Sequence, residues 1–206
     1  MTAEGLIVRL PWRVPVLLDL LLAARRAEPL PDVDPEVVRR AQRGDARAFT
    51  DLVRHYEPRL RALAYRLLDD RDLTDDVLQE AYVRAFKALG RFRGDSSLGT
   101  WLYRITYNAC IDELRRGRKV VPLFADYESD TVDTRAGPEE SAVARGDLAA
   151  ALASLPPELR AVVVLVDADG LDYREAAKVL GVPPGTVGSR LNRARTVLRA
   201  ALGVAG

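Results

Sequence analysis

The last helical stretch of the chain carries side chains that can bind nucleic acid. It reads GVPPGTVGSRLNRARTVLRAAL, residues 181–202, and contains no aspartate or glutamate. The whole chain is nearly neutral, with 31 lysines and arginines against 30 aspartates and glutamates, so this positive end is a local feature. Arginine, asparagine and hydroxyl side chains bond base edges and phosphates. The side chains here with that capacity are Thr186, Ser189, Arg190, Asn192 and Arg193.

A second basic stretch covers residues 84–119, where nine basic residues face three acidic ones, an excess of six positive charges. Aromatic residues are interleaved with these charges, at Phe92, Trp101, Tyr103 and Tyr107. Positive charge binds a nucleic-acid backbone, and stacking of bases on aromatic rings contributes about 1–3 kcal/mol per base. The stretch therefore predicts a site for single-stranded nucleic acid. The alternative is that Trp101 and Tyr107 lie in the protein core, and the sequence leaves both open.

The elements that position these residues are predicted to be helices. Aromatics make up only 6% of the chain, and apolar residues recur at a spacing of three to four in segment after segment. Even the β-prone run AVVVLV, residues 161–166, is predicted as a buried helix because helix formers precede it. Within this pattern, Pro58 predicts a kink or break near Glu57, and Asp72 is the expected N-cap of the following helix. The expected fold class is all-α.

The segment LDYREAAKVLGVPPGTVGSRLNRAR, residues 171–195, predicts a helix-turn-helix. The pair Ala176–Ala177 lets two helices approach closely, Gly181 can end the first helix, and the second helix is expected to begin near Gly185. In such a unit the second helix enters the DNA major groove with its N-terminal turns. The alternatives are an arginine-decorated solvent face, or two helices that pack together without DNA.

The chain divides into two predicted helical domains, at 35–119 and 141–206. The segment between them, 120–140, is acidic and lacks periodicity, so we expect a flexible linker. Residues 1–34 form an extension, expected to be disordered or a short docking helix, because its apolar run at 14–24 is shorter than a membrane span. Cys110 is the only cysteine, which excludes an internal disulfide, fits a reducing cytoplasm and predicts a buried thiol.

Two of these segments carry a family resemblance. The stretch DDVLQEAYVRAFKALGRFRGDSSLGTWLYRITYNACIDELRR resembles region 2 of bacterial RNA polymerase sigma factors, and residues 152–202 resemble their region 4. Two motifs in this order, with only a linker between them, are similar to the extracytoplasmic-function (ECF) type, group IV of the sigma-70 family. The resemblance covers Pro35–Leu202 and implies a helical region 2 bundle and a region 4 helix-turn-helix.

The resemblance implies a promoter-recognition protein rather than an enzyme. Such proteins bind core RNA polymerase through its β′ and β subunits, and an anti-sigma factor often holds them inactive, in some cases at the membrane. The acidic linker would occupy the basic RNA exit channel. The residues matching the surface that docks on the β′ coiled coil are Asp75, Asp76, Gln79 and Glu80, for which a solvated helix face is the alternative.

The resemblance also assigns the two DNA elements. Region 2 would melt the minus-ten element, capture a flipped base in the RFRGDSS loop, and hold phosphates with the basic residues that follow. The minus-ten set is Phe92, Arg93, Asp95, Ser96, Ser97, Trp101, Arg104, Asn108, Arg115, Arg116, Arg118 and Lys119. Region 4 would read the minus-thirty-five element. Its set is Thr186, Ser189, Arg190, Asn192, Arg193 and Arg195.

One residue departs from the family pattern. Gly188 stands where related chains often have a basic or polar residue just before the serine of the recognition helix. Glycine weakens a helix by up to about 1 kcal/mol relative to alanine and offers no side-chain contact. No cofactor, metal ion or small-molecule substrate is expected, because the sequence has no ligand cluster, carboxylate pair or phosphate-binding glycine loop. A stand-alone helix-turn-helix regulator is the alternative function.

Overall fold

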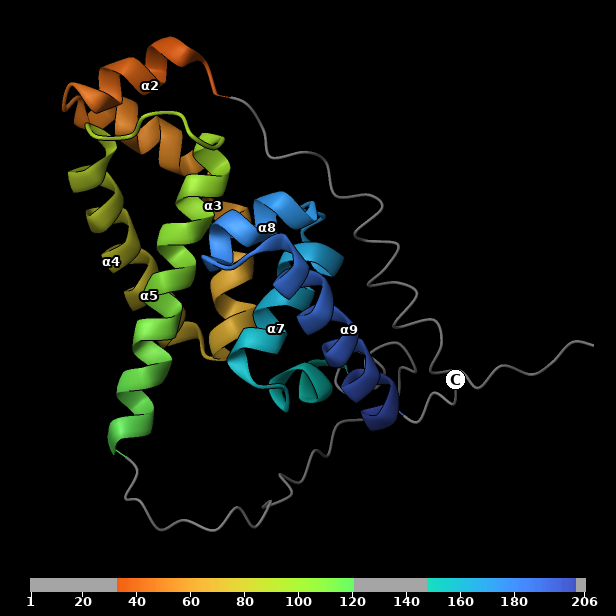
Figure 1. Cartoon of the computed structure of the whole chain (residues 1–206). Helices are drawn as coiled ribbons and strands as arrows, with labels where there is room; N and C mark the ends of the chain where they lie inside the picture. Colours follow the sequence, from red (N-terminus) through yellow and green to blue (C-terminus); the bar gives the residue numbers. More distant parts are fainter. Residues whose placement is uncertain (1–32, 121–147, 203–206) are drawn as a thin grey trace, which may run out of the picture.

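Every regular element in the described part of the chain is a helix, which confirms the predicted all-α fold (Figure 1). The computed structural model describes residues 33–120 and 148–202, without the side chains of 118–120. The apolar run at 14–24 and the acidic linker from residue 121 on lie outside the described residues. No helix in the two described segments is long and apolar enough to cross a bilayer.

The first domain, residues 33–120, is a four-helix unit whose helices begin at capping side chains. The carboxylates of Asp34, Asp45 and Asp70 each accept backbone N–H groups of the turn that follows. Asp70 caps its helix through the N–H of Leu73 at 3.0 Å, so the prediction that Asp72 is the cap is wrong by two residues. The helices are α2 (Pro35–Gln42), α3 (Ala46–Leu68), α4 (Arg71–Leu89) and α5 (Leu98–Val120).

Pro58 does not interrupt α3, which continues to Leu68. A proline inside a helix removes one hydrogen bond and costs about 3 kcal/mol. Leu52 lies before it and Leu60 and Leu63 lie after it, all fully buried, and each such leucine contributes about 1.5–3 kcal/mol. Burial of one continuous apolar face outweighs the lost hydrogen bond, so the break expected near Glu57 does not occur.

The second domain, residues 148–202, contains the apolar run AVVVLV as a helix, as predicted. The second half of that run adopts a π-helical turn, and the run is buried apart from half-buried Val166. A short helix at 148–153 precedes it. The remaining elements are α7 (Pro157–Val163), η1 (Val164–Ala168), α8 (Tyr173–Leu180) and α9 (Pro184–Ala201).

Helices α8 and α9 form the predicted helix-turn-helix. Asp172 and Glu175 make a capping box at the start of α8, each side chain accepting a backbone N–H of the other residue. Gly181 ends α8 with φ +66°, a left-handed conformation that glycine adopts without strain. The recognition helix α9 begins at Pro184, one residue before the predicted start.

The two domains pack directly against each other, which the sequence did not indicate. Helix α8 lies along α5, while α7 and η1 contact α3 (Figure 1). The buried apolar residues of both domains belong to one continuous core. The arrangement therefore places the helix-turn-helix beside the helix that carries most of the predicted minus-ten residues.

Candidate nucleic-acid and polymerase surfaces

The outer face of α9 presents polar side chains to solvent. Ser189, Asn192 and Arg193 are exposed, and the Ser189 hydroxyl donates to the carbonyl of Thr186 at 3.1 Å. Thr186 and Arg190 are half-buried at the edge of this face. Ser189, Asn192 and Arg193 are therefore the most accessible of the predicted minus-thirty-five residues. The side chains that hold α9 against the domain core are Val187, Leu191, Ala194 and Leu198.

Arg195 has a structural partner inside its own domain. Its Nε donates to Asp167 Oδ2 at 3.0 Å and its Nη2 to Asp167 Oδ1 at 2.5 Å, a bidentate pair. The Asp167 side chain is 6% exposed and that of Arg195 is 34% exposed. The hydrogen bonds that Arg195 donates to the Asp167 carboxylate raise the pKa of Arg195. Arg195 thus fixes α9 to η1, and its DNA contact stays a prediction.

Gly188 lies on the half-buried side of α9, next to a tyrosine ring of α8. A Cβ added there would meet the Tyr173 ring at 3.5 Å, an ordinary van der Waals contact. Space therefore does not require glycine at this position. A larger side chain on α9 would have to pass beside Tyr173, which is 44% exposed.

The loop between α4 and α5 is anchored at both ends. Gln42 Nε2 donates to the carbonyl of Phe92 at 3.1 Å, and the Phe92 ring packs on Trp101 with centroids 5.3 Å apart. Ser97 caps α5, accepting the Thr100 N–H at 3.1 Å. Between these anchors Arg93 and Asp95 are exposed and Ser96 is half-buried. Ser97 is thus tied to the helix start, while the middle of the loop faces solvent.

One face of α5 carries three exposed polar residues of the minus-ten set. Arg104, Asn108 and Arg115 are exposed, and half-buried Trp101 precedes them at helical spacing. A helix turns about 100° per residue, so these four residues share one side. The side chains of Arg118 and Lys119 lie outside the described residues.

Two of the predicted stacking aromatics are buried instead. Tyr103 is 0% exposed and Tyr107 is 7% exposed, on the side of α5 that faces the second domain. Burial raises the pKa of Tyr107, and the nearby charges of Glu158 and Arg190 belong to the second domain. The interpretation of Tyr103 and Tyr107 as available rings is therefore wrong for this arrangement. The alternative that Tyr107 lies in the protein core is confirmed, while the Trp101 side chain is half-buried.

A charge network joins α4 to α5. Arg84 donates to Glu80 at 2.7 Å and to Asp112 at 2.9 Å, and Arg116 pairs with Glu113 at 2.8 Å and with Glu80 at 3.3 Å. The hydrogen bond from Arg84 is the main cause that lowers the pKa of Glu80. Glu80 and Arg116, predicted for different partners, are therefore partly engaged with each other.

The polymerase-binding residues predicted on α4 are accessible. Asp75, Asp76 and Gln79 are exposed, and Glu80 is half-buried in the network just described. Asp75 is paired with Arg61 of α3. Val83, the next residue of this face, is 52% exposed, a high value for an apolar side chain. The face is thus a mixed acidic and apolar surface.

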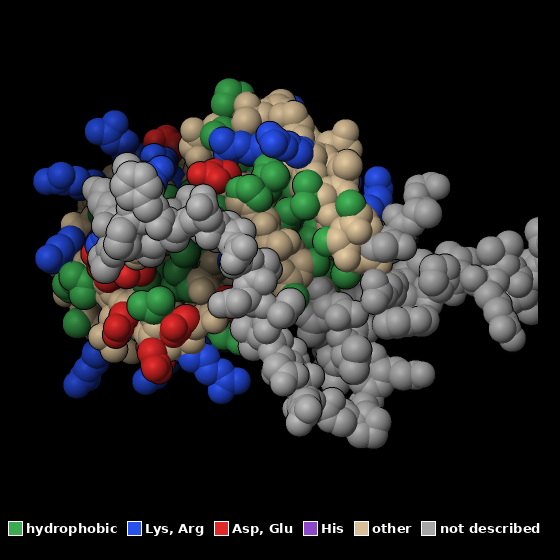
Figure 2. Space-filling view, turned by 90° about the horizontal axis from the view of Figure 1, so that it is seen from below, with side chains coloured by type: hydrophobic (Ala, Val, Ile, Leu, Met, Phe, Trp, Pro, Cys, Tyr) green, Lys and Arg blue, Asp and Glu red, His purple; other side chains and the backbone are tan. Residues whose placement is uncertain are grey.

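Basic side chains do not form one continuous patch on the face in Figure 2. Lysine and arginine side chains are spread around the rim of the described part of the molecule, with apolar and acidic groups between them. This face therefore offers no single positive surface among the described residues.

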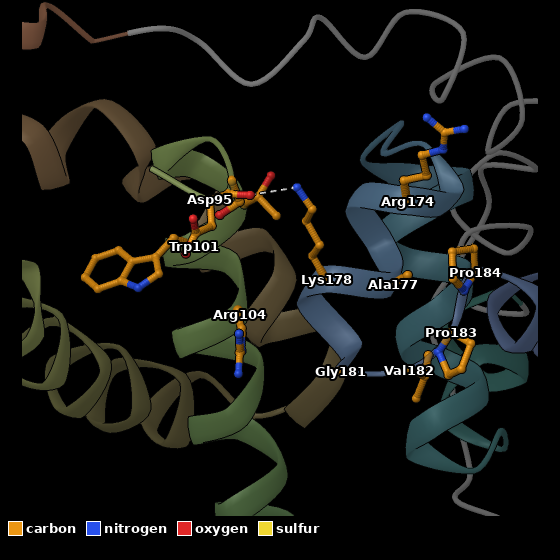
Figure 3. A pocket seen from close by; sticks show the side chains of 12 residues that line it. Asp95, Trp101, Arg104, Arg174, Ala177, Lys178, Gly181, Val182, Pro183 and Pro184 are labelled. Atoms are coloured by element: carbon orange, nitrogen blue, oxygen red, sulfur yellow. Dashed lines mark hydrogen bonds between the residues drawn. The ribbon is translucent and has the colours of Figure 1, made fainter. Parts of the chain in front are cut away.

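A cleft of about 770 Å³ lies between the first domain and the helix-turn-helix. Its walls come from the loop and start of α5 on one side and from α8 and the turn before α9 on the other (Figure 3). Lys178 of α8 reaches across it and donates to the carbonyl of Asp95 at 2.9 Å, while the Trp101 ring points away. Sequence analysis missed Lys178, because nothing local indicates a contact between residues so far apart in the chain.

Two family models match the chain, one in each domain. Residues 52–120 match the family model for sigma-70 region 2, and residues 145–198 match that for sigma-70 region 4. The RNA polymerase sigma-H factor of Pseudomonas aeruginosa is 38% identical, covering 82% of this chain and 93% of its own length. The ECF RNA polymerase sigma-E factor of Escherichia coli is 36% identical, covering 80% and 92%.

Two solved structures have a similar fold. CnrH in complex with the cytosolic domain of CnrY is 30% identical with a TM-score of 0.62, covering 85% of this chain and 100% of its own. The sigma factor RpoE in complex with the anti-sigma factor NepR, from Bartonella quintana, is 28% identical with a TM-score of 0.60, covering 77% and 98%.

The fold and the two surfaces define a DNA-binding regulator built from a region 2 bundle and a region 4 helix-turn-helix. The chain belongs to the ECF group of RNA polymerase sigma factors. It directs RNA polymerase to promoters.

Proposed function

We propose that the two domains divide promoter recognition between them. Helix α9 reads the minus-thirty-five element in the major groove with Ser189, Asn192 and Arg193, and Thr186 and Arg190 contribute from the edge of that face. The observation that carries this assignment is the exposure of these polar side chains on the second helix of a helix-turn-helix. The ion pair of Arg195 with Asp167 holds α9, which carries these side chains, against η1.

The first domain opens the minus-ten element. The loop around Arg93, Asp95 and Ser96 receives an unpaired base, and Trp101 borders the separated strand. Arg104, Asn108 and Arg115 follow the backbone along the outer face of α5. Support comes from the shared face of these residues and from the anchoring of the loop by Gln42 and Ser97, which fixes the recognising groups before DNA arrives.

Helix α4 binds core RNA polymerase. Asp76 and Gln79 are exposed, Asp75 and Glu80 add negative charge beside them, and Val83 adds exposed apolar area at the end of the face. Protein interfaces commonly combine apolar and polar groups in this way. Double substitution of Asp76 and Gln79 by alanine should weaken binding to core polymerase at least ten-fold. Asp51→Ala, an exposed carboxylate on α3, is the matched control, and equal affinity of the two variants contradicts the assignment.

The partners of this activity are core polymerase, promoter DNA and an anti-sigma factor. Two solved relatives are complexes, one with the cytosolic domain of CnrY and one with NepR, which supports an anti-sigma partner for this chain as well. The proposal places the protein in the cytoplasm, where polymerase and DNA are, and assigns it no catalytic residue, cofactor or metal.

Run-off transcription with core polymerase tests the function. Added to core, the chain should start transcripts at promoters of its own genome, and Arg193→Ala should reduce them by about ten-fold, since a lost base contact costs about 1–3 kcal/mol. A promoter mutated in the minus-thirty-five element should lose sensitivity to that substitution. If the chain binds duplex operators alone but never starts transcription, the stand-alone regulator is the correct function.

A further inference from the structure

An exposed tyrosine without an assigned role lies against the recognition helix. Tyr173 is the first residue of α8 and is 44% exposed. A Cβ on Gly188 of α9 would lie 3.5 Å from Cε2 and 3.9 Å from Cδ2 of the Tyr173 ring. Cε2 is the carbon closer to the hydroxyl group. The hydroxyl half of the ring, and not its stem, is therefore the part nearest to the recognition helix.

The same side of α9 carries Arg195. Residues 188 and 195 are two helical turns apart, so they lie one above the other on the helix surface. The pair with Asp167 uses Nε and Nη2 of Arg195 and fixes the plane of the guanidinium group. The hydrogen bonds with Asp167 raise the pKa of Arg195 most, and Tyr173 is close enough to raise it as well. Within the described residues, Arg195 Nη1 and the Tyr173 hydroxyl make no hydrogen bond, so both groups are available to a ligand.

Two donors at this place fit the phosphate backbone of DNA better than a base edge. When the second helix of a helix-turn-helix lies in the major groove, the first helix crosses the backbone. Tyr173 belongs to that first helix. Gly188 is half-buried at the edge of α9, whereas Ser189 and Arg193, proposed to read bases, are exposed. Tyrosine and arginine side chains are both among the usual phosphate contacts.

We propose that the Tyr173 hydroxyl and Arg195 Nη1 bind phosphates of one DNA strand beside the groove that α9 enters. Gly188 keeps this edge of α9 open, because it places no side chain between the two donors and the strand. The inference rests on the proposed function, since it takes α9 as the helix in the major groove. It gives Arg195 a role in holding DNA that is independent of base sequence, and it adds Tyr173, for which the sequence predicted no role.

Removal of the Tyr173 hydroxyl tests the first contact. A lost phosphate contact weakens binding to every DNA sequence, whereas a lost base contact relaxes the preference for one sequence. Two short duplexes separate these cases, one from a promoter that the chain transcribes and one of scrambled sequence. Tyr173→Phe should lower the affinity of the full chain for both duplexes by about five-fold. Tyr65→Phe is the matched control and should change neither affinity, because Tyr65 is a 42% exposed tyrosine of the first domain.

Substitution of Gly188 tests the second contact. Replacing Arg195 itself would also break its pair with buried Asp167, so the strand is kept away from the arginine instead. Gly188→Leu covers the edge of α9 and should lower affinity for both duplexes by about ten-fold. The slope of log K against log salt concentration should fall in magnitude by about 0.9, the value for one lost phosphate contact. Leucine favours a helix more than glycine does, so a weaker helix does not explain such a loss.

Gly188→Ala is the graded companion of this variant. Its single added carbon meets the Tyr173 ring at an ordinary contact distance. It should therefore lose less affinity and less salt dependence than Gly188→Leu. Equal losses in the two variants would place the effect in the helix backbone and overturn the role given to the open edge.

Fluorescence anisotropy of the labelled duplexes, titrated with the full chain at several salt concentrations, measures all of these variants. Equal affinities of Tyr173→Phe and Tyr65→Phe overturn the tyrosine contact, and a loss confined to the promoter duplex replaces it with base reading. An unchanged salt slope in Gly188→Leu overturns the arginine contact. Weaker binding of Tyr173→Phe to core polymerase, with DNA affinity unchanged, assigns the tyrosine to the polymerase and also overturns the proposal.

Run-off transcription by the wild-type chain separates this inference from the proposed function. A chain that starts no transcripts rejects the proposed function, and the scrambled duplex then still decides the phosphate contact. A chain that starts transcripts while its variants bind both duplexes like the control rejects the phosphate contact alone.

Discussion

Asp167 and Asp169 are two residues apart in the chain, yet their side chains lie in different environments. Asp167 is held inside the second domain, with both oxygens bonded to Arg195. Asp169 lies at the boundary between domains, with one oxygen on Arg66 and the other without a partner among the described residues. Two carboxylates of similar burial, 6% and 9% exposed, thus make a complete and an incomplete ion pair. The difference teaches that burial alone does not say how completely a carboxylate is paired.

The largest expected effect comes from breaking the complete pair. Arg195→Ala leaves Asp167 buried and charged, so the free energy of unfolding of the second domain should fall by about 3 kcal/mol. Arg66→Ala should lower that quantity by a smaller amount, because burial already raises the pKa of Asp169 and this carboxyl can take up a proton when its cation is lost. Hydrogen exchange of the α9 amides measures both.

Arg199→Ala is the control for this comparison, since Arg199 is exposed on the same helix. Equal losses in the free energy of unfolding for Arg195→Ala and Arg66→Ala would show that the two ion pairs contribute equally to stability. That result would contradict the contrast between the complete and the incomplete pair.

A change of pH should have an intermediate effect on stability. Burial raises the pKa of Asp169 above its ordinary value, and the facing charges of Arg66 and Arg59 oppose that shift without cancelling it. The folded chain therefore holds a proton on Asp169 more tightly than the unfolded chain does. Linkage then favours the folded chain as pH falls from neutral towards the ordinary carboxylate range near 4, and that contribution is lost as pH rises through the elevated pKa.

Urea unfolding, repeated across this pH range, checks the sign. Tyr103 also faces Asp169, but burial raises its pKa, so it does not titrate in this window. The contribution of Asp169 to this pH dependence, read as the difference between the wild-type chain and Asp169→Asn, should favour folding at the lower pH. A difference of the opposite sign contradicts the assignment to Asp169.

The smallest effect is expected at the exposed network of α4 and α5. Glu80 is about two-fifths exposed, so Glu80→Gln should change stability by less than about 1 kcal/mol although it touches both Arg84 and Arg116. Its effect on affinity for core polymerase should be larger, because the free face of Glu80 belongs to the predicted docking surface. Urea unfolding and a polymerase binding titration separate the two; a large loss of stability would place Glu80 among the structural pairs.

Local chemistry made much of the fold predictable. The capping box of Asp172 and Glu175, the left-handed Gly181 and the apolar spacing of α9 all act within a few residues, so the helix-turn-helix follows from a short stretch of sequence. The prediction at Asp72 failed because Asp70, two residues earlier, offers the same carboxylate to the first free N–H groups. The break expected at Pro58 failed because burial of leucines on both sides is a tertiary effect.

The amino-acid sequence determined that this protein is helical, that its charges gather in two segments, and which polar side chains those segments carry. Only the tertiary structure decided which of these side chains are free. Arg195 is engaged by Asp167, 28 residues away, and Arg66 by Asp169, 103 residues away. Tyr103 and Tyr107 are buried on the side of α5 that faces the other domain. Contacts at such separations leave no local pattern, because they depend on how whole helices pack and not on the spacing of neighbouring residues.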